Sequence, residues 1–422
     1  MSQNRKPFEV AIIGGGIAGI TLAISLLKRN ILCTIYERAH TFSEVGAGLG
    51  VSPNAQDAMA AKVANGNGWE SKKNILFEFL DGMDGTADTT PLFSITNRTG
   101  LQGCHRGQFV NELLRIVPDD VVRFNMQLDS VKDHDGGRLQ LFFQDGTVVE
   151  ADAIIGCDGI KSKVREILVG KDHPSAKCSY TYKYAYRGMI PMDQATEVLG
   201  EERALNATIW TGKDMHLLTY PVAHGTILNA LAYCSSSSDW PSETQLTLPA
   251  TKNDFLADFK GFRPLVMKII EKARNLDQWA IFDVGDNPVP TFAKGRMCII
   301  GDAAHASTPH HGAGAGLCIE DAAVLASLLA HERVQTGTDI KAVFAAFDKS
   351  RRARTQWVVQ QSRRGGDLYE LQTELRNDYE KIARELRETL SVFWGYNVQD
   401  AIGEAMVDLE ERLRAGIERS MI

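Results

Sequence analysis

The 422-residue sequence predicts an α/β fold: a parallel sheet built from two separated stretches of chain, an antiparallel sheet inserted between them, and helices at the C-terminal end. Three observations predict this arrangement. A strand, a glycine-rich turn, a helix and a second strand follow one another over residues 8–36, as in a βαβ unit. Residues 177–280 hold a separate run of strands. A buried strand at residues 297–300, followed by a glycine-rich turn and a helix, is predicted to rejoin the parallel sheet of the first stretch. Residues 340–422 are rich in Arg, Glu, Gln, Ala and Leu, which predicts helices.

The turn of the βαβ unit carries the pattern G-x-G-x-x-G. Gly14, Gly16 and Gly19 lie between an apolar strand at residues 8–13 and a helical pattern at residues 20–28. Glycines permit a tight turn and a close backbone approach, so the free N–H groups at the start of the helix face the pyrophosphate of a dinucleotide. The sequence therefore predicts a Rossmann-like nucleotide site.

The second strand, residues 31–36, ends at Glu37. A carboxylate at this position accepts hydrogen bonds from the hydroxyl groups of the adenosine ribose. We assign the neighbouring Arg38 to the same nucleotide site. These features do not distinguish NAD from FAD.

The middle of the first stretch is less regular. A polar Gly/Asp/Thr-rich segment at residues 81–100 predicts a surface excursion, and residues 121–150 alternate as short strands. A buried strand at residues 153–155 then leads into Gly-Cys-Asp-Gly. Asp158 and Ser162 are good helix-capping residues, so this second motif is by itself equally consistent with a cofactor contact and with a capped turn.

The return strand is followed by the third motif, GDAAHASTPHHGAGAG, at residues 301–316. Asp302 comes directly after the strand, where a carboxylate can bind a ribityl hydroxyl. The start of the next helix can stabilise negative charge on a planar ring, as carried by a reduced flavin. This motif favours FAD. The changes of pattern along the chain predict an FAD-binding domain at residues 1–176, a substrate-binding antiparallel sheet at 177–280, a return segment at 281–340 and C-terminal helices at 341–422.

Composition excludes several classes of protein. The formal net charge is −7 and no long Lys/Arg tract is present, which predicts no nucleic-acid partner. The seven cysteines are odd in number and show no C-x-x-C pair, so we expect a reducing compartment and no metal site. The apolar run at residues 10–27 is short and rich in glycine, which argues against a membrane span and favours a cytoplasmic protein.

With the three motifs in this order, the chain resembles the single-component class A flavoprotein monooxygenases, the family of p-hydroxybenzoate hydroxylase and salicylate hydroxylase. The resemblance covers nearly the whole chain. It implies a p-hydroxybenzoate hydroxylase-type fold with FAD as cofactor, NADH or NADPH as co-substrate and O2 as oxidant. It also implies hydroxylation of a small phenolic substrate through a C4a-hydroperoxyflavin.

The family's pattern implies further FAD contacts. Gly50, at the end of Gly-Ala-Gly-Leu-Gly, matches a position near the flavin, and Arg106 matches an arginine that reaches the cofactor. Asp158 belongs to the second motif of the family. Gly314 and Ala315 follow Asp302 at the flavin-contacting end of the third motif.

Arg187 and Tyr220 are the candidate catalytic residues. Arg187 lies on an apolar strand, where a buried charge is costly unless it binds a partner. Tyr220 lies on another strand of the same predicted sheet. A guanidinium can hold a phenolate or carboxylate, and a tyrosine hydroxyl can share the hydrogen bond. The alternative is that Arg187 forms a buried ion pair and Tyr220 is packing. The two segments look most like the fungal salicylate-hydroxylase-like enzymes, including the dearomatising 3-methylorcinaldehyde-type monooxygenases, in which a matching arginine and tyrosine activate the substrate.

Other interpretations stay open at this point. The flavin chemistry can also serve epoxidation or indole oxidation of a non-phenolic substrate, and a non-catalytic redox-sensing flavoprotein is a third hypothesis. His305, His310 and His311 near the expected flavin edge are more often packed loop residues than proton relays. Aromatic residues on the C-terminal helices raise the hypothesis of a homodimer. The pattern does not choose between decarboxylative, simple and dearomatising hydroxylation, or between NADH and NADPH.

Overall fold

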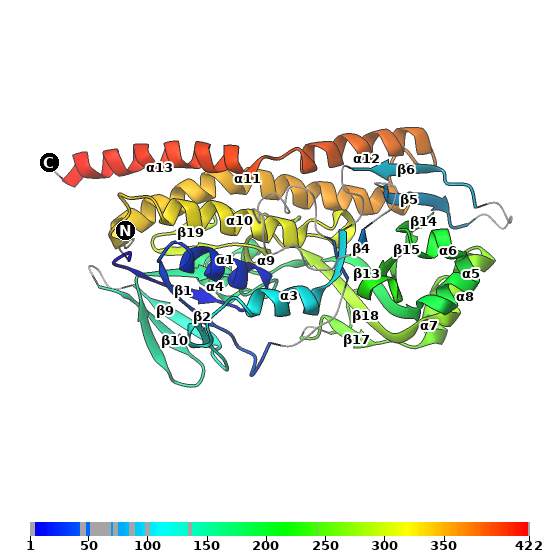
Figure 1. Cartoon of the computed structure of the whole chain (residues 1–422), viewed down its shortest axis with the longest axis horizontal. Helices are drawn as coiled ribbons and strands as arrows, with labels where there is room; N and C mark the ends of the chain where they lie inside the picture. Colours follow the sequence, from blue (N-terminus) through cyan, green and yellow to red (C-terminus); the bar gives the residue numbers. More distant parts are fainter. Residues whose placement is uncertain are drawn as a thin grey trace.

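The computed structural model describes residues 5–42, 48–50, 69–70, 75–83, 89–97, 102–133, 137–242 and 244–420, and every structural statement below refers to these residues. A parallel sheet occupies one end of the molecule and a large, mainly antiparallel sheet the other (Figure 1). The long helix α11 (Gly337–Tyr369) contacts both sheets, since it touches β19 of the first and β14 of the second. The α/β fold class is confirmed.

The parallel sheet has the strand order β19-β20-β12-β1-β2-β8. Only β19 runs antiparallel to its neighbour. Val10, Ile12 and Ile154 have no exposed surface, as expected for parallel strands covered on both faces. The predicted βαβ unit and return strand are therefore confirmed. The six strands are β1 (Glu9–Ile13), β2 (Leu32–Tyr36), β8 (Val122–Arg123), β12 (Ala153–Gly156), β19 (Ala293–Lys294) and β20 (Met297–Ile299).

The large sheet has eight strands in the order β17-β18-β13-β16-β15-β14-β5-β6. The predicted surface excursion at residues 81–100 needs correction, because β6 lies within it and the end of β5 enters it. The physical reason is that β5 pairs in parallel with β14, more than a hundred residues later in the chain. The local sequence pattern does not reveal a strand partner that is so far away. The strands are β5 (Ile75–Asp81), β6 (Phe93–Thr96), β13 (Ser179–Pro191), β14 (Thr208–Gly212), β15 (Met215–Val222), β16 (Ile227–Ser235), β17 (Thr247–Pro249) and β18 (Arg274–Asp283).

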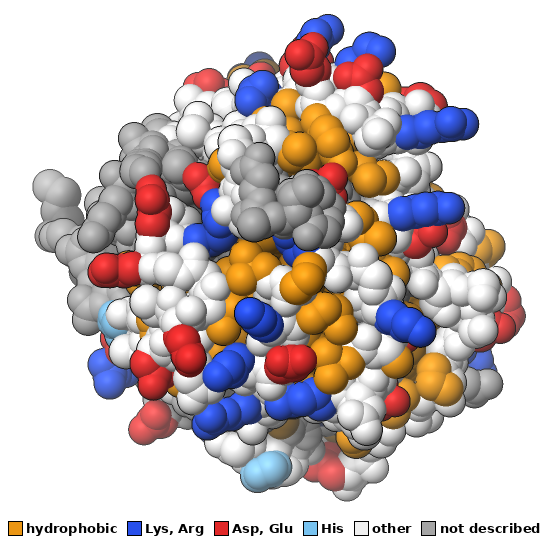
Figure 2. All heavy atoms as spheres, turned by 90° about the vertical axis from the view of Figure 1, so that its right-hand side faces the viewer, with side chains coloured by type: hydrophobic (Ala, Val, Ile, Leu, Met, Phe, Trp, Pro, Cys, Tyr) orange, Lys and Arg blue, Asp and Glu red, His pale blue; other side chains and the backbone are white. Residues whose placement is uncertain are grey.

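One face of the large sheet is closed by short helices. Tyr186, Leu217 and Ala232 lie in a core with residues of α5, α7 and α8. On the outside of this end of the molecule, charged side chains of both signs are interspersed with apolar ones (Figure 2). The helices involved are α5 (Met192–Leu199), α6 (Glu201–Ala204), α7 (Lys252–Asp258) and α8 (Pro264–Lys272).

The remaining elements frame the two sheets. Helices α10, α11 and α13 pack on one another, and α10 also packs on α1. None of the described helices combines the length and apolar character that crossing a membrane requires. The small sheets consist of β3 (Gly48–Gly50), β4 (Trp69–Glu70) and β7 (Gln102–His105), and of β9 (Leu128–Lys132), β10 (Leu139–Phe143) and β11 (Val148–Ala151). The other helices are α1 (Ile17–Leu27), α3 (Arg106–Leu114), α4 (Lys163–Val169), α9 (Asp302–His305), α10 (Gly314–Leu329), α12 (Tyr379–Trp394) and α13 (Val398–Ser420).

Candidate active site

Three glycine-bearing turns meet at the carboxyl ends of β1, β12 and β20, which are neighbours in the parallel sheet. Gly14 has φ +104°, and a Cβ there would lie 2.5 Å from the carbonyl oxygen of Cys157 in the second turn. Gly301 has φ +61°, and its Cβ would lie 3.0 Å from the Cβ of Ala18, just after the first turn. Both positions require glycine. The three motifs therefore lie together at the edge where open α/β sheets bind nucleotides.

The first turn of α1 is open to a ligand. Its N-cap residue is Gly16, no side chain caps the helix, and a Cβ on Gly16 would meet no described atom within 4 Å. Glu37 lies beside this turn, where its carboxylate accepts hydrogen bonds from the backbone N–H groups of Gly15 at 2.7 Å and Ala39 at 2.9 Å. Arg38 is exposed next to it. Free helix N–H groups bind phosphate, so these residues fit the pyrophosphate and ribose of FAD.

Asp158 caps helix α4. Its carboxylate accepts hydrogen bonds from the Ser162 hydroxyl at 2.5 Å and from the backbone N–H groups of Lys163 at 2.7 Å and Val164 at 3.1 Å. Burial raises the pKa of Asp158, and these hydrogen bonds act in the opposite direction. The capped-turn interpretation is confirmed, while a contact between Asp158 and FAD stays a prediction.

Arg165 ties the second motif to the third. Its side chain has no exposed surface, and it donates hydrogen bonds to the carbonyl oxygens of Ile160, Ala176 and Ala303. Ala303 belongs to the third motif, so one buried guanidinium fixes the two turns relative to each other. Arg165, three residues after Ser162 in the sequence, is thus a structural residue of the second motif.

Asp302, the first residue of α9, lies beside the start of α10. Its Oδ1 is 3.9 Å from the Cβ position of Gly314, the first residue of that helix, and the Asp302 side chain is exposed. Gly314 and Ala315 are half-buried, and no side chain caps α10. Arg106 begins α3 directly after β7, which pairs with the strand that ends at Gly50. In the part of the chain that the structure describes, no side chain caps α10 beside Asp302, and the flavin contacts of Asp302, Gly50 and Arg106 stay predictions.

A buried charge cluster, formed by His305, Glu320, Asp321 and Arg351, supports the turn at Gly301. Asp321 accepts a hydrogen bond from the Gly301 N–H at 3.0 Å and lies 2.6 Å from Nε2 of His305. Arg351 on α11 contacts Asp321 at 2.8 Å and Glu320 at 2.6 Å. Burial alone would raise the pKa of Asp321, but the neighbouring His305 and Arg351 lower it overall to about 2. Asp321 therefore stays ionised and holds the turn.

The large sheet places Arg187 and Tyr220 on the same face. Arg187 lies opposite Leu231, and Leu231 lies opposite Leu218. Residues opposite each other in antiparallel strands share a face, and Tyr220 is two residues after Leu218 on the same strand. We call this surface the substrate face. The structure thus brings the two candidate catalytic residues together, with leucines between them.

Arg187 also has a protein partner. Its guanidinium lies 2.5 Å from the carboxylate of Asp277 and 4.7 Å from the ring centre of Trp279. The ion pair that the sequence left as an alternative is therefore present. Tyr220 is 7% exposed and packs with Ala207 and Val222.

The substrate face is turned toward the third motif. His216 and Tyr233 are opposite each other on this face, and their rings stack with centres 4.5 Å apart. The ring of His310, in the third motif, lies 5.1 Å from that of Tyr233 and 5.5 Å from that of His216. Burial lowers the pKa of His310 well below its usual range, so its ring is neutral. We call the third motif, residues 301–316, the flavin loop; through His310 it packs directly on the substrate face.

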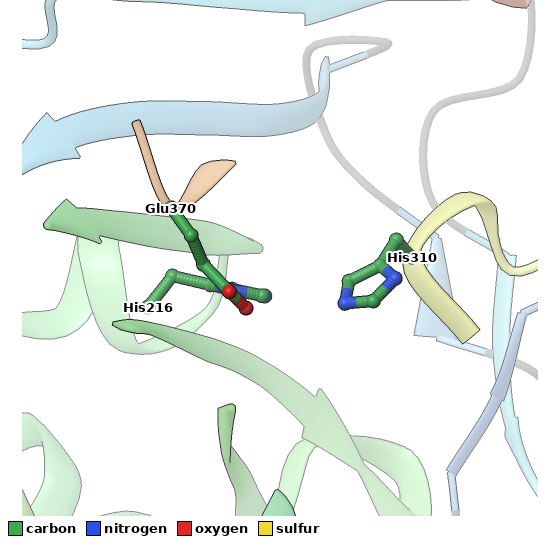
Figure 3. Close-up of side chains that lie close together, drawn as sticks. All are labelled: His216, His310 and Glu370. Carbon is green, nitrogen blue, oxygen red and sulfur yellow. The ribbon is translucent and has the colours of Figure 1, made fainter. Parts of the chain in front are cut away.

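His216, His310 and Glu370 offer ligand atoms within 4.8 Å of one another, and Figure 3 shows the first and last of them side by side, with His310 across from them. These are zinc-binding group types. However, the ammonium group of Lys183 lies 2.5 Å from one oxygen of Glu370, and His216 Nδ1 lies 3.2 Å from the other. A positive charge already sits where a cation would bind, so the geometry favours an ion-paired polar cluster. Sequence reasoning missed Glu370, which follows the last helical residue of α11.

Two adjacent glycines in α11 make room for the flavin loop. A Cβ on Gly366 would lie 2.6 to 2.8 Å from three ring atoms of His310, and one on Gly365 would lie 2.5 Å from Nε2 of His311. Glycine inside a helix costs about 1 kcal/mol relative to alanine, so its presence here has a packing reason. The histidines are packed against the helix, as the sequence favoured.

Gly366→Ala is expected to lower the free energy of unfolding by about 1–3 kcal/mol and to shift the flavin absorption bands, because the added methyl group forces His310 and its loop away from α11. Gly403→Ala on α13 is the control, since a Cβ there meets no described atom within 4 Å. That variant should gain stability and leave the flavin spectrum unchanged. Urea unfolding and absorption spectra of both holoenzymes test this, and equal behaviour of the two variants would contradict it.

Comparisons with known proteins agree with this architecture. The family model described as "FAD binding domain" matches residues 7–362. The chain is similar to the FAD-dependent monooxygenase pigN of Monascus ruber, at 42% identity over 98% of this chain and 99% of that protein. It is also similar to the salicylate hydroxylase asL1 of Sarocladium schorii, at 37% identity over 97% of this chain and 93% of that protein.

A solved structure has the same fold. A salicylate hydroxylase in complex with substrate superimposes with a TM-score of 0.83, at 29% identity, over 95% of this chain and 98% of that one. The matched region includes both sheets, because it spans nearly the entire chain. Together with the open α1 turn and the converging glycine motifs, these findings show that the chain belongs to the FAD-dependent monooxygenases of the salicylate hydroxylase type.

Proposed function

We propose that this enzyme uses NADH or NADPH and O2 to hydroxylate a phenolic small molecule. The observation that carries the proposal is the position of Arg187 and Tyr220 on one face of the large sheet, across from the flavin loop. The salicylate hydroxylase relatives support a phenolic acid, and the matching arginine and tyrosine support a hydroxybenzaldehyde equally well.

FAD, when bound beside the three glycine turns, would supply the oxygen-activating chemistry, and that chemistry requires an electron-rich carbon on the substrate ring. A phenol becomes electron-rich enough when it loses its proton. The guanidinium of Arg187 stabilises the resulting phenolate, and the hydroxyl group of Tyr220 donates a hydrogen bond to the same oxygen. Leu218 and Leu231 between them give the ring an apolar floor that excludes water.

The direct test measures NADH and NADPH oxidation by the holoenzyme with salicylates, resorcinols and hydroxybenzaldehydes, followed by the mass of each product. We expect a phenolic compound to accelerate oxidation at least about tenfold and to gain one oxygen atom, because substrate-gated oxidation avoids wasteful peroxide release. A product that also loses CO2 identifies decarboxylative hydroxylation. Acceleration only by alkenes or indoles would contradict the phenolic assignment, and no acceleration by any compound would favour a redox-sensing role.

A further inference from the structure

Asn229 on β16 is a buried amide without a partner. The residue has no exposed surface, and neither its Nδ2 nor its Oδ1 has a hydrogen-bond partner in the described structure. An unpaired polar group in the interior costs about 1–3 kcal/mol, so native proteins keep few of them. The surrounding strand, Ile-Leu-Asn-Ala-Leu, is otherwise apolar, and a leucine at this position would avoid the cost.

The register places this amide on the substrate face. Asn229 lies directly opposite Tyr220 on β15 and directly opposite Met189 on β13. Arg187 is two residues before Met189, so it is the diagonal neighbour of Asn229 on the same face. Directly opposed side chains start about 5 Å apart and diagonal ones about 7–8 Å apart. Asn229 therefore lies on the substrate face between the positions of Arg187 and Tyr220, opposite Tyr220 and diagonal to Arg187.

We propose that Asn229 is a substrate-specificity residue, whose amide binds a second, uncharged oxygen substituent of the aromatic substrate. This rests on the proposed function, in which Arg187 and Tyr220 hold the phenolate. An amide presents both a donor and an acceptor, so it complements a carbonyl group through Nδ2 or a hydroxyl group through Oδ1. The substrate class that fits is a phenol with an additional hydroxyl, formyl or keto group, rather than a phenol with one polar group.

The test compares wild type with Asn229→Leu, which removes the amide and keeps the branched shape of the side chain with slightly more bulk. The probes are 2,4-dihydroxybenzaldehyde, 2-hydroxy-4-methylbenzaldehyde, in which a methyl group replaces the 4-hydroxyl group, and 4-methylresorcinol, in which a methyl group replaces the formyl group. Binding is followed by the change in flavin absorbance of the holoenzyme. We expect Asn229→Leu to raise the Kd for 2,4-dihydroxybenzaldehyde about tenfold, and to leave unchanged the Kd of the one probe that lacks the recognised group.

Stability gives a second readout that needs no substrate. Because the amide is unpaired, Asn229→Leu should keep or raise the thermal midpoint of the holoenzyme. Thr219→Val is the matched control: Thr219 is also fully buried with an unpaired hydroxyl group, but as the neighbour of Tyr220 on the strand it points to the opposite face. Thr219→Val should bind all three probes as the wild type does. Asn229→Ala should repeat the ligand pattern of Asn229→Leu without added bulk.

Three outcomes would overturn the proposal. Equal Kd values for wild type and Asn229→Leu with every probe would show that the amide holds only a water molecule. A clear loss of stability in both Asn229 variants would show that the amide serves the fold. If the wild type binds none of the probes, the phenolic substrate class itself is wrong. That failure is distinguishable, because it appears in the wild type before any variant is compared.

Discussion

Arg187→Ala is expected to lower kcat/KM for the preferred phenol by about a hundredfold or more, the usual effect of removing one partner of a desolvated charge pair. The phenol then keeps its proton at neutral pH, because no positive charge lowers its pKa in the site. Activity of the variant should therefore recover as the pH rises through the pKa of the free phenol, whereas the wild type needs no such rise. Steady-state kinetics over a pH series measures both effects.

Asp277 provides the control for Arg187. If Arg187 serves only its ion pair, Arg187→Ala and Asp277→Asn should lose activity and stability alike. If it binds the phenolate, Asp277→Asn should keep kcat/KM within about tenfold of wild type, because the guanidinium is still present. Arg187→Lys should restore part of the activity, since it returns the charge without the planar fork. The free energy of unfolding should fall by only about 1–2 kcal/mol in Arg187→Ala, because Trp279 Nε1 still donates to Asp277 at 2.8 Å.

The nucleotide-binding half of the fold was predictable from sequence because its signals are local. Gly14, Gly301 and the strands before them form short, contiguous patterns of apolar residues followed by glycine. No further information is needed to predict where the motifs meet, because parallel strands joined by helices bring their carboxyl ends to one edge of the sheet. The positions of Glu37 and Asp302 at that edge follow for the same reason.

The substrate side was predictable only in part. A charge on an apolar strand drew attention to Arg187, and the same argument applies to Lys183, which is four residues earlier on the same face, and to the amide of Asn229. Glu370 carried no local signal, because its partners Lys183 and His216 lie more than 150 residues away in the chain. Long-range pairing of this kind emerges only when the sheet and α11 are both in place.

The second motif shows a different limit of prediction from sequence. Asp158 follows the pattern of a cofactor ligand and also of a helix cap, and sequence cannot separate the two because both place a carboxylate before a helix. In the structure, two backbone N–H groups at the start of α4 and the Ser162 hydroxyl group donate hydrogen bonds to that carboxylate. The buried Arg165 beside it, which joins two motifs through carbonyl oxygens, had no sequence signal beyond its position.

Arg351→Met is expected to lower the free energy of unfolding by up to about 3–5 kcal/mol, because the buried Asp321 then keeps only His305, and the buried Glu320 only Arg354, as a positive partner among the described residues. The methionine keeps much of the side-chain volume, so a cavity contributes little. Arg352→Ala is the matched control: the side chain of the neighbouring Arg352 is 40% exposed, and among the described residues it pairs with Asp348, one turn away on the same helix. Its loss should cost about 0.5 kcal/mol or less. Urea unfolding of both variants, with and without added FAD, measures the difference.

The dependence of stability on acid pH shows whether the ionised Asp321 causes the loss of stability in Arg351→Met. The pKa of Asp321 in the folded protein, about 2, lies below its ordinary value of 3.8, so its stabilising contribution is present at neutral pH and is lost as the pH falls from 3.8 toward 2. Without Arg351 the pKa of Asp321 rises toward 3.8, so the variant has less stabilisation at neutral pH, and its further loss of stability between pH 3.8 and 2 should be smaller than in the wild type. Flavin content should fall in parallel, because Asp321 holds the Gly301 N–H and with it the turn that carries Asp302. An Arg351→Met enzyme with the acid profile and flavin content of wild type would show that the Gly301 turn is held without this cluster.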